Sequence, residues 1–451
     1  MESNIIIIGG GPAGVIAALT ANSVYPDKSV LLIKEIGDGV IPCAIPYMIH
    51  TLDDPKKNAM GDQPLKDAGI KIIVDKVVNI DVTIKNISLE SGNTFRFEKL
   101  ILATGSRPKD LPIPGIEKQG VFGIEKSLSY NTIIREKAKQ ANDIVILGGG
   151  FIGAEFADEI SKEGHTKVHV VEILPKILST AFDDEFCDAA EKQLTGCGVS
   201  IHKRRSITTI NGTDKVESVT LDNGEQLRAD MVLVGIGGKP NVELAKKTGL
   251  LITEGGSIWV DSYMRTKNKD IFAIGDCALK RDFFTRLEVP VWLASTATSE
   301  ARIAGTNLYG VRVLRQIQGT ISAFSTRFGD LSLASAGMIS HECEKEGFSV
   351  VTGQAVAPDR HPGFLPGAAP LKVKLIFAKR SGILLGGQVS GGLSVGELIN
   401  TIALGIQMKL NVRELDMMQI ATHPLLTPAP TVHPLINAAH QALGKLREDN
   451  E

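Results

Sequence analysis

The sequence is poor in cysteine and has almost no excess of charge of either sign. Five of its 451 residues are cysteines, an odd number of widely separated positions, which excludes a disulfide framework and predicts a reducing, cytoplasmic environment. Lys plus Arg number 49 against 51 for Asp plus Glu, so no basic surplus exists for nucleic acid. The chain also lacks apolar runs of the ~18 residues that a membrane helix needs, so we expect no membrane association.

Glycine, by contrast, is plentiful: 46 residues, many of them in tight clusters. Two of these clusters repeat one pattern, in the segments Asn4–Gly14 and Asp143–Gly153. Each has a short run of Ile, Val and Leu, then a glycine turn, then a helical pattern and a second apolar run that leads to an acid, Glu35 or Glu172. This order predicts two βαβ units about 140 residues apart, a duplicated dinucleotide-binding fold.

The spacing of the glycines explains why the pattern suits a dinucleotide. The first glycine allows a tight turn, the second lets a pyrophosphate approach the backbone, and the third lets helix and strand pack closely. The phosphates then meet the free N–H groups of a helix N-terminus. One such motif is weak evidence for a dinucleotide site, but two motifs, each between a strand and a helix, are strong evidence. The alternative is two ordinary glycine turns in an α/β protein. The glycines concerned are Gly9, Gly11 and Gly14 in the first loop and Gly148, Gly150 and Gly153 in the second.

Glu172 bears on the choice of coenzyme. An acid at this position accepts a hydrogen bond from a ribose 2′-hydroxyl and repels a 2′-phosphate, which favours NADH. His165, Lys167 and Lys176 lie nearby in sequence, so NADPH stays open, and Glu172 acting only as a strand cap is the alternative.

The remaining sequence predicts further strands and a third domain. Short apolar runs that end in turn residues predict strands at Lys99–Gly105, Asp230–Gly235 and Ile271–Asp276. Residues 295–309 are predicted to form a helix. From Gly319 onward, strands with short turns precede two helices, near Ser394–Lys409 and His433–Leu446. The strands begin at residues 320, 331, 348, 371 and 382. The fold class is therefore α/β, with two Rossmann-like domains and a C-terminal α+β domain.

Three further segments give the sequence a family resemblance. Ala103–Pro108 (ATGSRP) is similar to the strand and turn between a flavin domain and a nicotinamide domain. Thr266–Asp276 (TKNKDIFAIGD) resembles the second flavin motif, whose final Asp bonds the ribityl chain. Together with the two glycine loops, these segments resemble the pyridine nucleotide–disulfide oxidoreductases over essentially the whole chain.

This resemblance implies FAD and NADH as cofactors, with NADPH as an option and coenzyme A as a further candidate ligand. It places an FAD-binding domain at residues 1–112 and 245–318, an NAD(P)H-binding domain at 113–244 and a dimerisation domain at 319–451. The residues that it implies for cofactor binding are Gly9, Gly11, Pro12, Ala13, Gly14, Glu35, Ala103, Thr104, Gly105, Gly275 and Asp276 for FAD, and Gly148, Gly150, Phe151, Ile152, Gly153, Glu155, Glu172 and Gly237 for the nicotinamide coenzyme. No metal is expected.

The redox centre indicates a branch of the family. Glutathione reductase-like members have two cysteines four residues apart, whereas this chain has Cys43 alone, in the sequence CAIPY. That sequence resembles the C-x-x-P-Y of coenzyme A-disulfide reductases, persulfide and polysulfide reductases, and NADH oxidases and peroxidases. His361–Phe377 resembles the dimerisation domain of the same branch.

The chain also departs from that branch. It has Gly39 where a Ser is usual, Phe364 and Leu365 where coenzyme A-disulfide reductases have a Tyr, and Thr422 where they have another. The first helix lacks the basic residue expected to meet coenzyme A phosphates. These differences count against simple coenzyme A-disulfide specificity.

Cys43 is the expected catalytic residue. Flanking prolines suggest that it lies at a helix N-terminus, where the dipole would lower its thiol pKa. Without a nearby partner cysteine, its oxidised form must be a mixed disulfide or persulfide with the substrate, or a sulfenic acid. A small buried hydrophobe is the alternative role. Cys187, Cys197, Cys277 and Cys343 are interpreted as structural.

The other expected site residues surround this thiol. His423, in a His-Pro pair and supplied by the partner subunit of a homodimer, is a candidate proton donor, although a structural histidine fits its Pro-rich loop equally well. Pro428 stands where glutathione reductase-like enzymes have the Glu that orients this histidine. The predicted substrate-binding residues are Pro42, Tyr47, His361 and Phe364.

The sequence is consistent with three functions. The first is NAD(P)H-dependent reduction of a persulfide, polysulfide or coenzyme A disulfide. The second is an NADH oxidase or peroxidase that uses a Cys43 sulfenic acid. The third, an electron-transfer flavoprotein reductase or a redox-sensing protein, is disfavoured because ferredoxin reductase-like members lack the Cys43 motif.

Overall fold

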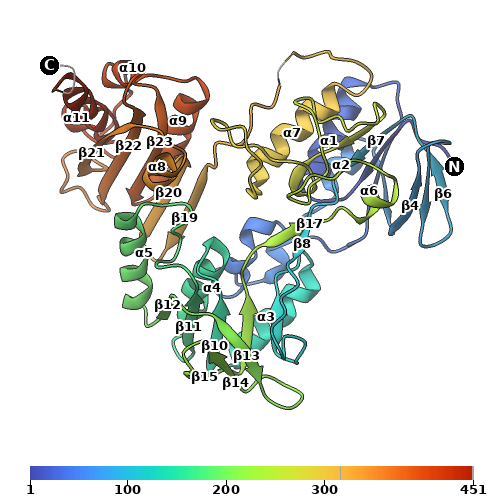
Figure 1. The fold of residues 1–451 in the computed structure, drawn as a ribbon, viewed down its shortest axis with the longest axis horizontal. Coiled ribbons are helices and arrows are strands. Elements are labelled where there is room, and N and C mark those ends of the chain that lie inside the picture. Colours follow the sequence, from blue (N-terminus) through green and yellow to red (C-terminus); the bar gives the residue numbers. More distant parts are fainter. Residues whose placement is uncertain (315, 449–451) are drawn as a thin grey trace.

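The computed structural model describes residues 1–314 and 316–448 and contains three bodies, each built around its own sheet. Figure 1 shows the third body, coloured orange to red, beside the second, while the first lies across the view from it. The N-terminus and the C-terminal helix lie at opposite sides of the molecule (Figure 1).

The first body contains a parallel five-stranded sheet in the order β18-β7-β1-β2-β3, with a three-stranded antiparallel sheet, β4-β5-β6, at its side. Strand β1 (Ile5–Ile8) is fully buried, which explains why its four isoleucines do not alternate with polar residues. The other strands are β2 (Val30–Lys34), β3 (Lys71–Val74), β4 (Val77–Asp81), β5 (Asn86–Leu89), β6 (Thr94–Arg96), β7 (Lys99–Leu102) and β18 (Ile271–Ala273). The helices are α1 (Pro12–Val24), α2 (Gln63–Asp67) and α7 (Ala294–Thr306), with α6 (Glu243–Lys247) beside the small sheet.

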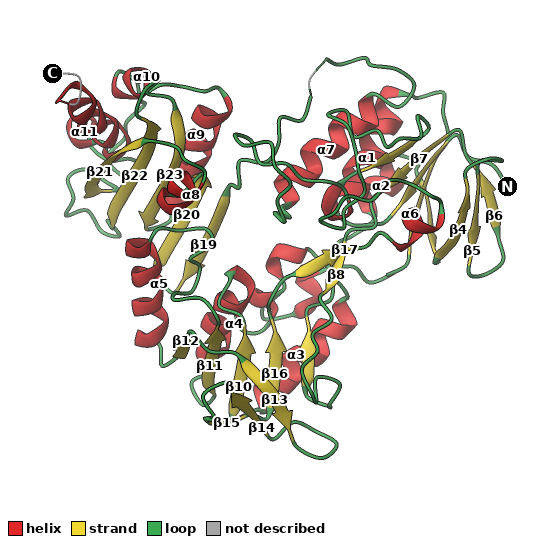
Figure 2. Ribbon diagram, viewed as in Figure 1, coloured by secondary structure: helices red, strands yellow, loops and turns green. Residues whose placement is uncertain are grey.

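The second body repeats this design, with the parallel order β12-β11-β10-β16-β9 and the small antiparallel sheet β13-β14-β15. Its strands are β9 (Val121–Gly123), β10 (Asp143–Leu147), β11 (Lys167–Glu172), β12 (Ser200–Lys203), β13 (Ile207–Asn211), β14 (Ser218–Leu221), β15 (Gln226–Arg228) and β16 (Met231–Val234). Its helices are α3 (Leu128–Gln140), α4 (Phe151–Ser161) and α5 (Asp184–Gly196). A two-stranded connection, β8 (Ser106–Pro108) with β17 (Gly238–Pro240), joins the two bodies (Figure 2).

The third body is an antiparallel sheet in the order β19-β20-β23-β22-β21, with helices packed against it (Figure 2). Its strands are β19 (Phe324–Phe328), β20 (Leu331–Gly337), β21 (Val350–Pro358), β22 (Pro370–Ala378) and β23 (Leu384–Gly391). Its helices are α8 (Ser340–Lys345), α9 (Val395–Gln407), α10 (Val412–Asp416) and α11 (Pro434–Glu448). The predicted fold class, two Rossmann-like domains followed by an α+β domain, is confirmed.

Some predicted boundaries were wrong, for local reasons. The strand expected from residue 320 begins only at Phe324, because Ser322 has a φ of +49° and interrupts the extended chain. The strands expected to reach Gly105 and Asp276 end at Leu102 and Ala273, because Gly105 and Gly275 also have positive φ. The chain turns at both places beside the first glycine loop.

Candidate active site

The first glycine loop has the shape that a pyrophosphate needs. A Cβ at Gly9 would lie 2.1 Å from the Ala103 carbonyl oxygen, and a Cβ at Gly14 would lie 1.9 Å from that of Gly9, so neither position tolerates a side chain. A Cβ at Gly11 would meet nothing within 4 Å, so that face of the loop is open. Gly11 caps α1 without a side-chain hydrogen bond, which leaves the first N–H groups of the helix available to an anion.

The second loop has the same geometry. Gly153 packs against Gly148, with a Cβ of Gly153 placed 1.9 Å from the Gly148 oxygen, while the space at Gly150 is open. Gly150 also caps α4 without a side-chain bond. Ile152 and Phe151 begin this helix, and Phe151 stacks on Phe324 of β19 with ring centroids 4.9 Å apart. The loop is therefore open toward solvent and tied to the third body at its helical end.

The first glycine loop and the end of the second flavin motif meet in space. Gly275 lies against the first turn of α1, since a Cβ there would be 3.1 Å from the Cβ of Ala13. The next residue, Asp276, accepts hydrogen bonds from Ser106 Oγ at 2.7 Å and from Lys126 Nζ at 3.2 Å. The structure thus brings Pro12–Gly14, Ala103–Gly105 and Gly275–Asp276 to one edge of the sheet, as the sequence predicted. Ser106 and Lys126 were missed, although both follow strands whose ends the glycines mark.

A buried ion pair supports this turn. Lys280 and Glu300 are joined by a 3.0 Å contact, and each side chain is 2% exposed. Glu300 accepts the Gly275 N–H at 2.8 Å, and Lys280 donates to the Gly275 oxygen at 2.6 Å. Loss of one partner from such a pair costs about 3–5 kcal/mol, because the other charge is left buried and alone. The pair therefore fixes the backbone at the residue before Asp276.

The acids at the carboxyl ends of β2 and β11 lie in different surroundings. Glu35 is exposed and pairs with Lys76 at 3.1 Å. Glu172 is buried, and its two carboxylate oxygens accept the N–H groups of Gly149, at 2.6 Å, and of Leu174, at 2.7 Å. Gly237, with a φ of +83°, lies between β16 and β17.

Cys43 lies in a three-residue 3₁₀ turn, Pro42–Ala44, followed at once by a second turn, Pro46–Met48. It is exposed, which removes the interpretation of a small buried hydrophobe. The expected lowering of its pKa was wrong. Desolvation by neighbouring atoms raises the pKa of the thiol, and the Glu155 carboxylate raises it further, because both disfavour a thiolate. A single 3₁₀ turn offers too few aligned peptide dipoles to offset them.

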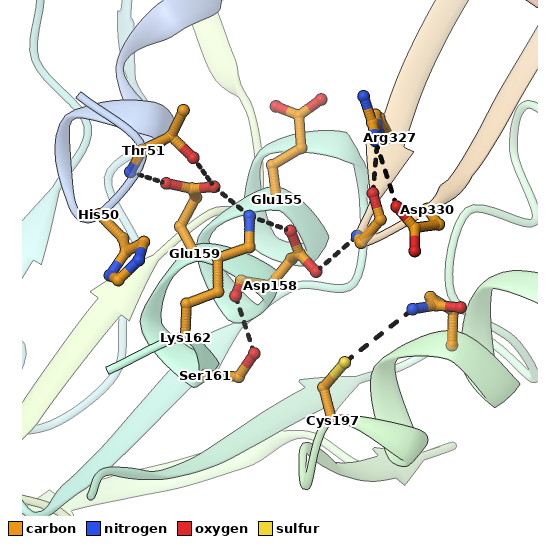
Figure 3. A network of polar contacts seen from close by, with 12 residues as sticks. His50, Thr51, Glu155, Asp158, Glu159, Ser161, Lys162, Cys197, Arg327 and Asp330 are labelled. Carbon is orange, nitrogen blue, oxygen red and sulfur yellow. Dashed lines mark hydrogen bonds and ion pairs between the residues drawn. The ribbon is translucent and has the colours of Figure 1, made fainter. Parts of the chain in front are cut away.

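Helix α4 carries three carboxylates, Glu155, Asp158 and Glu159, between the segment at His50 and Thr51 and the third body (Figure 3). Glu159 accepts from the Thr51 N–H and hydroxyl, both at 2.7 Å, and Asp158 accepts from the Gly329 N–H at 3.0 Å. Lys162 contacts both of these acids, at 2.5 Å and 2.8 Å. The helix therefore links the Cys43 segment to the β19–β20 turn.

The third of these carboxylates, Glu155, forms no ion pair with a cation among residues 1–314 and 316–448. It is 9% exposed and accepts one hydrogen bond, from Thr326 Oγ1 of β19 at 2.8 Å. Burial, together with the charges of Asp158 and Glu159, raises the pKa of Glu155 to about 7. The pKa of Tyr47 is also raised, by burial and then by Glu155, so this phenol stays protonated at neutral pH. Thr326 could not be found from the sequence, because its contact depends on how the third body packs.

The predicted residues of the third body lie together. The His361 N–H donates to the Pro424 oxygen at 3.0 Å, and His361 Nδ1 contacts the Thr427 oxygen at 2.9 Å. His423 Nδ1 accepts the Leu425 N–H at 3.2 Å, which leaves Nε2 as the N–H position of the neutral ring. Phe364 is 99% exposed. These loops hydrogen-bond to each other, and none of those bonds reaches the Cys43 turn of the same chain.

Comparison with known proteins identifies the family. Residues 3–301 match the model of the pyridine nucleotide-disulphide oxidoreductases, and residues 323–433 match the dimerisation domain of the same family. The chain belongs to the pyridine nucleotide-disulphide oxidoreductase family. It is therefore an FAD- and NAD(P)H-dependent oxidoreductase.

Individual relatives cover almost the whole chain. An NADH oxidase from Methanocaldococcus jannaschii is 31% identical over 98% of this chain and 99% of the relative. An NAD(P)H coenzyme A polysulfide/persulfide reductase from Pyrococcus horikoshii is 31% identical, with 97% of each chain covered. Among solved structures, a NAD-dependent persulfide reductase from A. fulgidus has a TM-score of 0.90 at 28% identity, covering 99% of this chain and 84% of that one.

Two further findings concern what the described residues lack. No helix among residues 1–314 and 316–448 is long and apolar enough to cross a membrane. Within the same residues, no group of three or more His, Cys, Asp or Glu side chains could hold a metal ion.

Proposed function

We propose that this protein uses NAD(P)H to reduce a persulfide, a polysulfide or coenzyme A disulfide through Cys43. The observation that carries the proposal is an exposed, unpaired thiol in a turn beside Glu155 of α4, the helix that follows the second glycine loop. Cys187, Cys277 and Cys343 are buried, and the exposed Cys197 lies at the end of α5, outside that turn. The names of the relatives from P. horikoshii and A. fulgidus support sulfur substrates.

The cofactor positions follow from the two loops. FAD fits the Gly9–Gly14 loop, with Glu35 toward its adenosine ribose and Asp276 toward its ribityl chain, and the nicotinamide coenzyme fits the Gly148–Gly153 loop. Bound there, FAD would accept a hydride from NAD(P)H and deliver two electrons to sulfur. The protein supplies open glycine turns, two helix N-termini and the anchored Asp276 carboxylate.

Cys43 performs the sulfur chemistry. With a persulfide R–S–SH, the thiolate attacks the R-bearing sulfur, the S–S bond of the substrate breaks, and HS⁻ leaves a mixed disulfide Cys43–S–S–R. Two electrons from NAD(P)H and one proton then cleave that bond to R–SH and the Cys43 thiolate. Pro42, Tyr47, His361 and Phe364 are the proposed lining for R, and His423 is the proposed donor of the proton through its Nε2.

An NADH oxidase among the relatives supports oxidase or peroxidase activity as a second function. The M. jannaschii protein is named an NADH oxidase, and it is as similar to this chain as the persulfide reductase from P. horikoshii. In that case Cys43 would alternate between thiolate and sulfenic acid, with oxygen or a peroxide as the oxidant.

We also propose a homodimer with shared active sites. The match to a family dimerisation domain and several exposed apolar side chains on the third body support it. The exposed side chains concerned are Phe364, Leu393, Leu404, Met408, Met417, Leu425 and Leu426. Since His423 does not reach the Cys43 turn through the hydrogen bonds of its own loop, a partner would bring it there. We expect light scattering to give twice the chain mass; a fully active monomer would contradict this.

The domain limits and the cellular location remain proposals of the same kind. We propose residues 1–112 with 245–318 for FAD, 113–244 for NAD(P)H and 319–451 for dimerisation. The first hydrophobic core supports this division, because it combines residues 5–33 and 65–103 with residues 242–308, while Val40, Ile45, Met48 and Ile49 pack into the second core. Five free thiols support a reducing, cytoplasmic location, without nucleic-acid or membrane partners.

The test is anaerobic NADH turnover with polysulfide, coenzyme A persulfide, coenzyme A disulfide and glutathione disulfide, beside peroxide and, in air, oxygen. We expect the highest turnover with one of the first three acceptors. Turnover with oxygen or peroxide alone would establish the second function instead, and no turnover with any acceptor would contradict both.

A further inference from the structure

The coenzyme specificity expected from Glu172 does not agree with how that side chain is placed. An acid that selects NADH has to present its carboxylate to the ribose 2′-hydroxyl. In this protein the carboxylate is buried, and both oxygens accept backbone N–H groups of the surrounding loop, Gly149 and Leu174. These bonds spread its charge and hold it inside, so its repulsion of a 2′-phosphate is weakened.

A group of cations lies at the same edge. Strand β12 runs parallel to β11, with Lys203 opposite Glu172, and ends there. The backbone continues beside the Glu172 segment, since the Arg205 N–H donates to the backbone carbonyl oxygen of Glu172 at 3.0 Å and the Arg204 N–H to that of Leu174 at 3.2 Å. Because a coenzyme ribose lies outside the carboxyl ends of these strands, the cations lie where a 2′-phosphate would arrive.

Most of these cations already have carboxylate partners. Lys203 pairs with Glu191 at 2.7 Å, Lys176 with Asp188 at 2.5 Å, and the Arg205 guanidinium lies 4.0 Å from Asp222. Arg204 differs, because its exposed side chain has no carboxylate within ion-pair distance among the described residues.

The backbone of Arg204 is also unusual. Its φ is +54°, in the left-handed region that residues other than glycine and asparagine rarely adopt. Such a conformation is strained, and strained residues are more frequent at functional positions. Glycine or asparagine would adopt it more easily, so an arginine here calls for a reason beyond the turn itself. Next to it, Ile173 and Leu174 expose apolar surface, 70% and 38%, against which an adenine ring can pack.

We propose that Arg204 binds the 2′-phosphate of NADPH and so sets the preference of this enzyme between NADPH and NADH. A planar guanidinium matches a phosphate with two parallel hydrogen bonds, which a paired lysine does not offer. This inference rests on the proposed function only in taking the Gly148–Gly153 loop as the coenzyme site. Arg204 is then a specificity residue that leaves hydride transfer itself unchanged.

The test compares coenzymes and probes in the flavin-containing enzyme. The variant Arg204→Asn removes the charge and keeps a residue suited to positive φ. Arg204→Lys keeps the charge without the planar guanidinium. The control is Arg228→Asn, which removes an exposed arginine from the same domain. We expect Arg204→Asn to raise the KM for NADPH about tenfold and that for NADH less than twofold. Arg204→Lys should give an intermediate value, and Arg228→Asn should leave the ratio unchanged.

Calorimetry with adenosine phosphates separates this inference from the proposed reaction. We expect 2′,5′-ADP to bind the wild type more tightly than 5′-AMP, with the difference lost in Arg204→Asn, whatever the sulfur acceptor is. Tighter binding of 3′,5′-ADP than of 2′,5′-ADP would assign the position to coenzyme A instead and overturn the proposal. An unchanged NADPH preference in Arg204→Asn would also overturn it. Failure of the proposed function would appear separately, as 2′,5′-ADP binding without sulfur turnover.

Discussion

Replacing Cys43 by serine should abolish sulfur-acceptor turnover, with a loss of several orders of magnitude, while NADH still reduces the flavin at the wild-type rate. A serine hydroxyl has nearly the same size, but it is not ionised near neutral pH and cannot form a persulfide or a mixed disulfide. Hydride transfer depends on the two glycine loops, which the substitution does not touch. Stopped-flow absorbance of the flavin, beside steady-state turnover, measures both rates.

Cys197→Ser is the matched control, because Cys197 is the other exposed thiol. We expect its turnover to equal that of the wild type. Slow reduction of oxygen should persist in Cys43→Ser, since reduced flavin reacts with oxygen unaided. Sulfur turnover near the wild-type rate in Cys43→Ser would show that Cys43 is structural. Loss confined to peroxide turnover would favour the oxidase or peroxidase instead.

The glycine loops show what a sequence predicts well. Their function depends on local geometry, a tight turn between a buried strand and a helix, and the residues that make it are neighbours in the chain. The structure accordingly has both loops, both parallel sheets and the open faces at Gly11 and Gly150. The two long helices of the third domain, α9 and α11, were also predicted to within two residues, because their periodicity is local, whereas the short helices α8 and α10 were not predicted.

The electrostatics of the site could not be predicted in the same way. The pKa of Cys43 depends on Glu155, more than 100 residues away in sequence, and the hydrogen bond to Glu155 comes from Thr326 of another domain. Lys126 and Asp276 meet across a similar separation. Glu172 was placed correctly by its motif, yet only the structure shows that its carboxylate faces the loop. Contacts between distant segments decide these properties, and no local pattern reports them.

Substituting Glu155 by glutamine should make the protein more stable at pH 8 and leave its stability at pH 4 unchanged. The pKa of this carboxyl is about 7 in the folded chain against an ordinary 4.5, so the folded state holds the proton more tightly than the unfolded state does. The stabilisation is fully present below pH 4.5, falls as the pH rises, and is lost above pH 7, a change of roughly 3 kcal/mol. Glutamine keeps the shape and the bond to Thr326 without ionising. Thermal midpoints measured from pH 4 to pH 8 should therefore fall less steeply in Glu155→Gln than in the wild type.

The same substitution should increase the reactivity of Cys43 above pH 7. Ionised Glu155 raises the pKa of the thiol, so its removal should increase the thiolate fraction at pH 8 by roughly threefold, an effect expected for one partly screened charge. Iodoacetamide alkylation of the reduced enzyme measures it, in a Cys197→Ser background so that Cys43 is the exposed thiol that reacts. Glu159→Gln is the control, because Lys162 and Thr51 already stabilise the charge of that carboxylate. Its loss should loosen the Cys43 segment without changing the dependence of the alkylation rate on pH near pH 7. Equal alkylation rates for wild type and Glu155→Gln from pH 6 to pH 9 would show that Glu155 does not control the nucleophile.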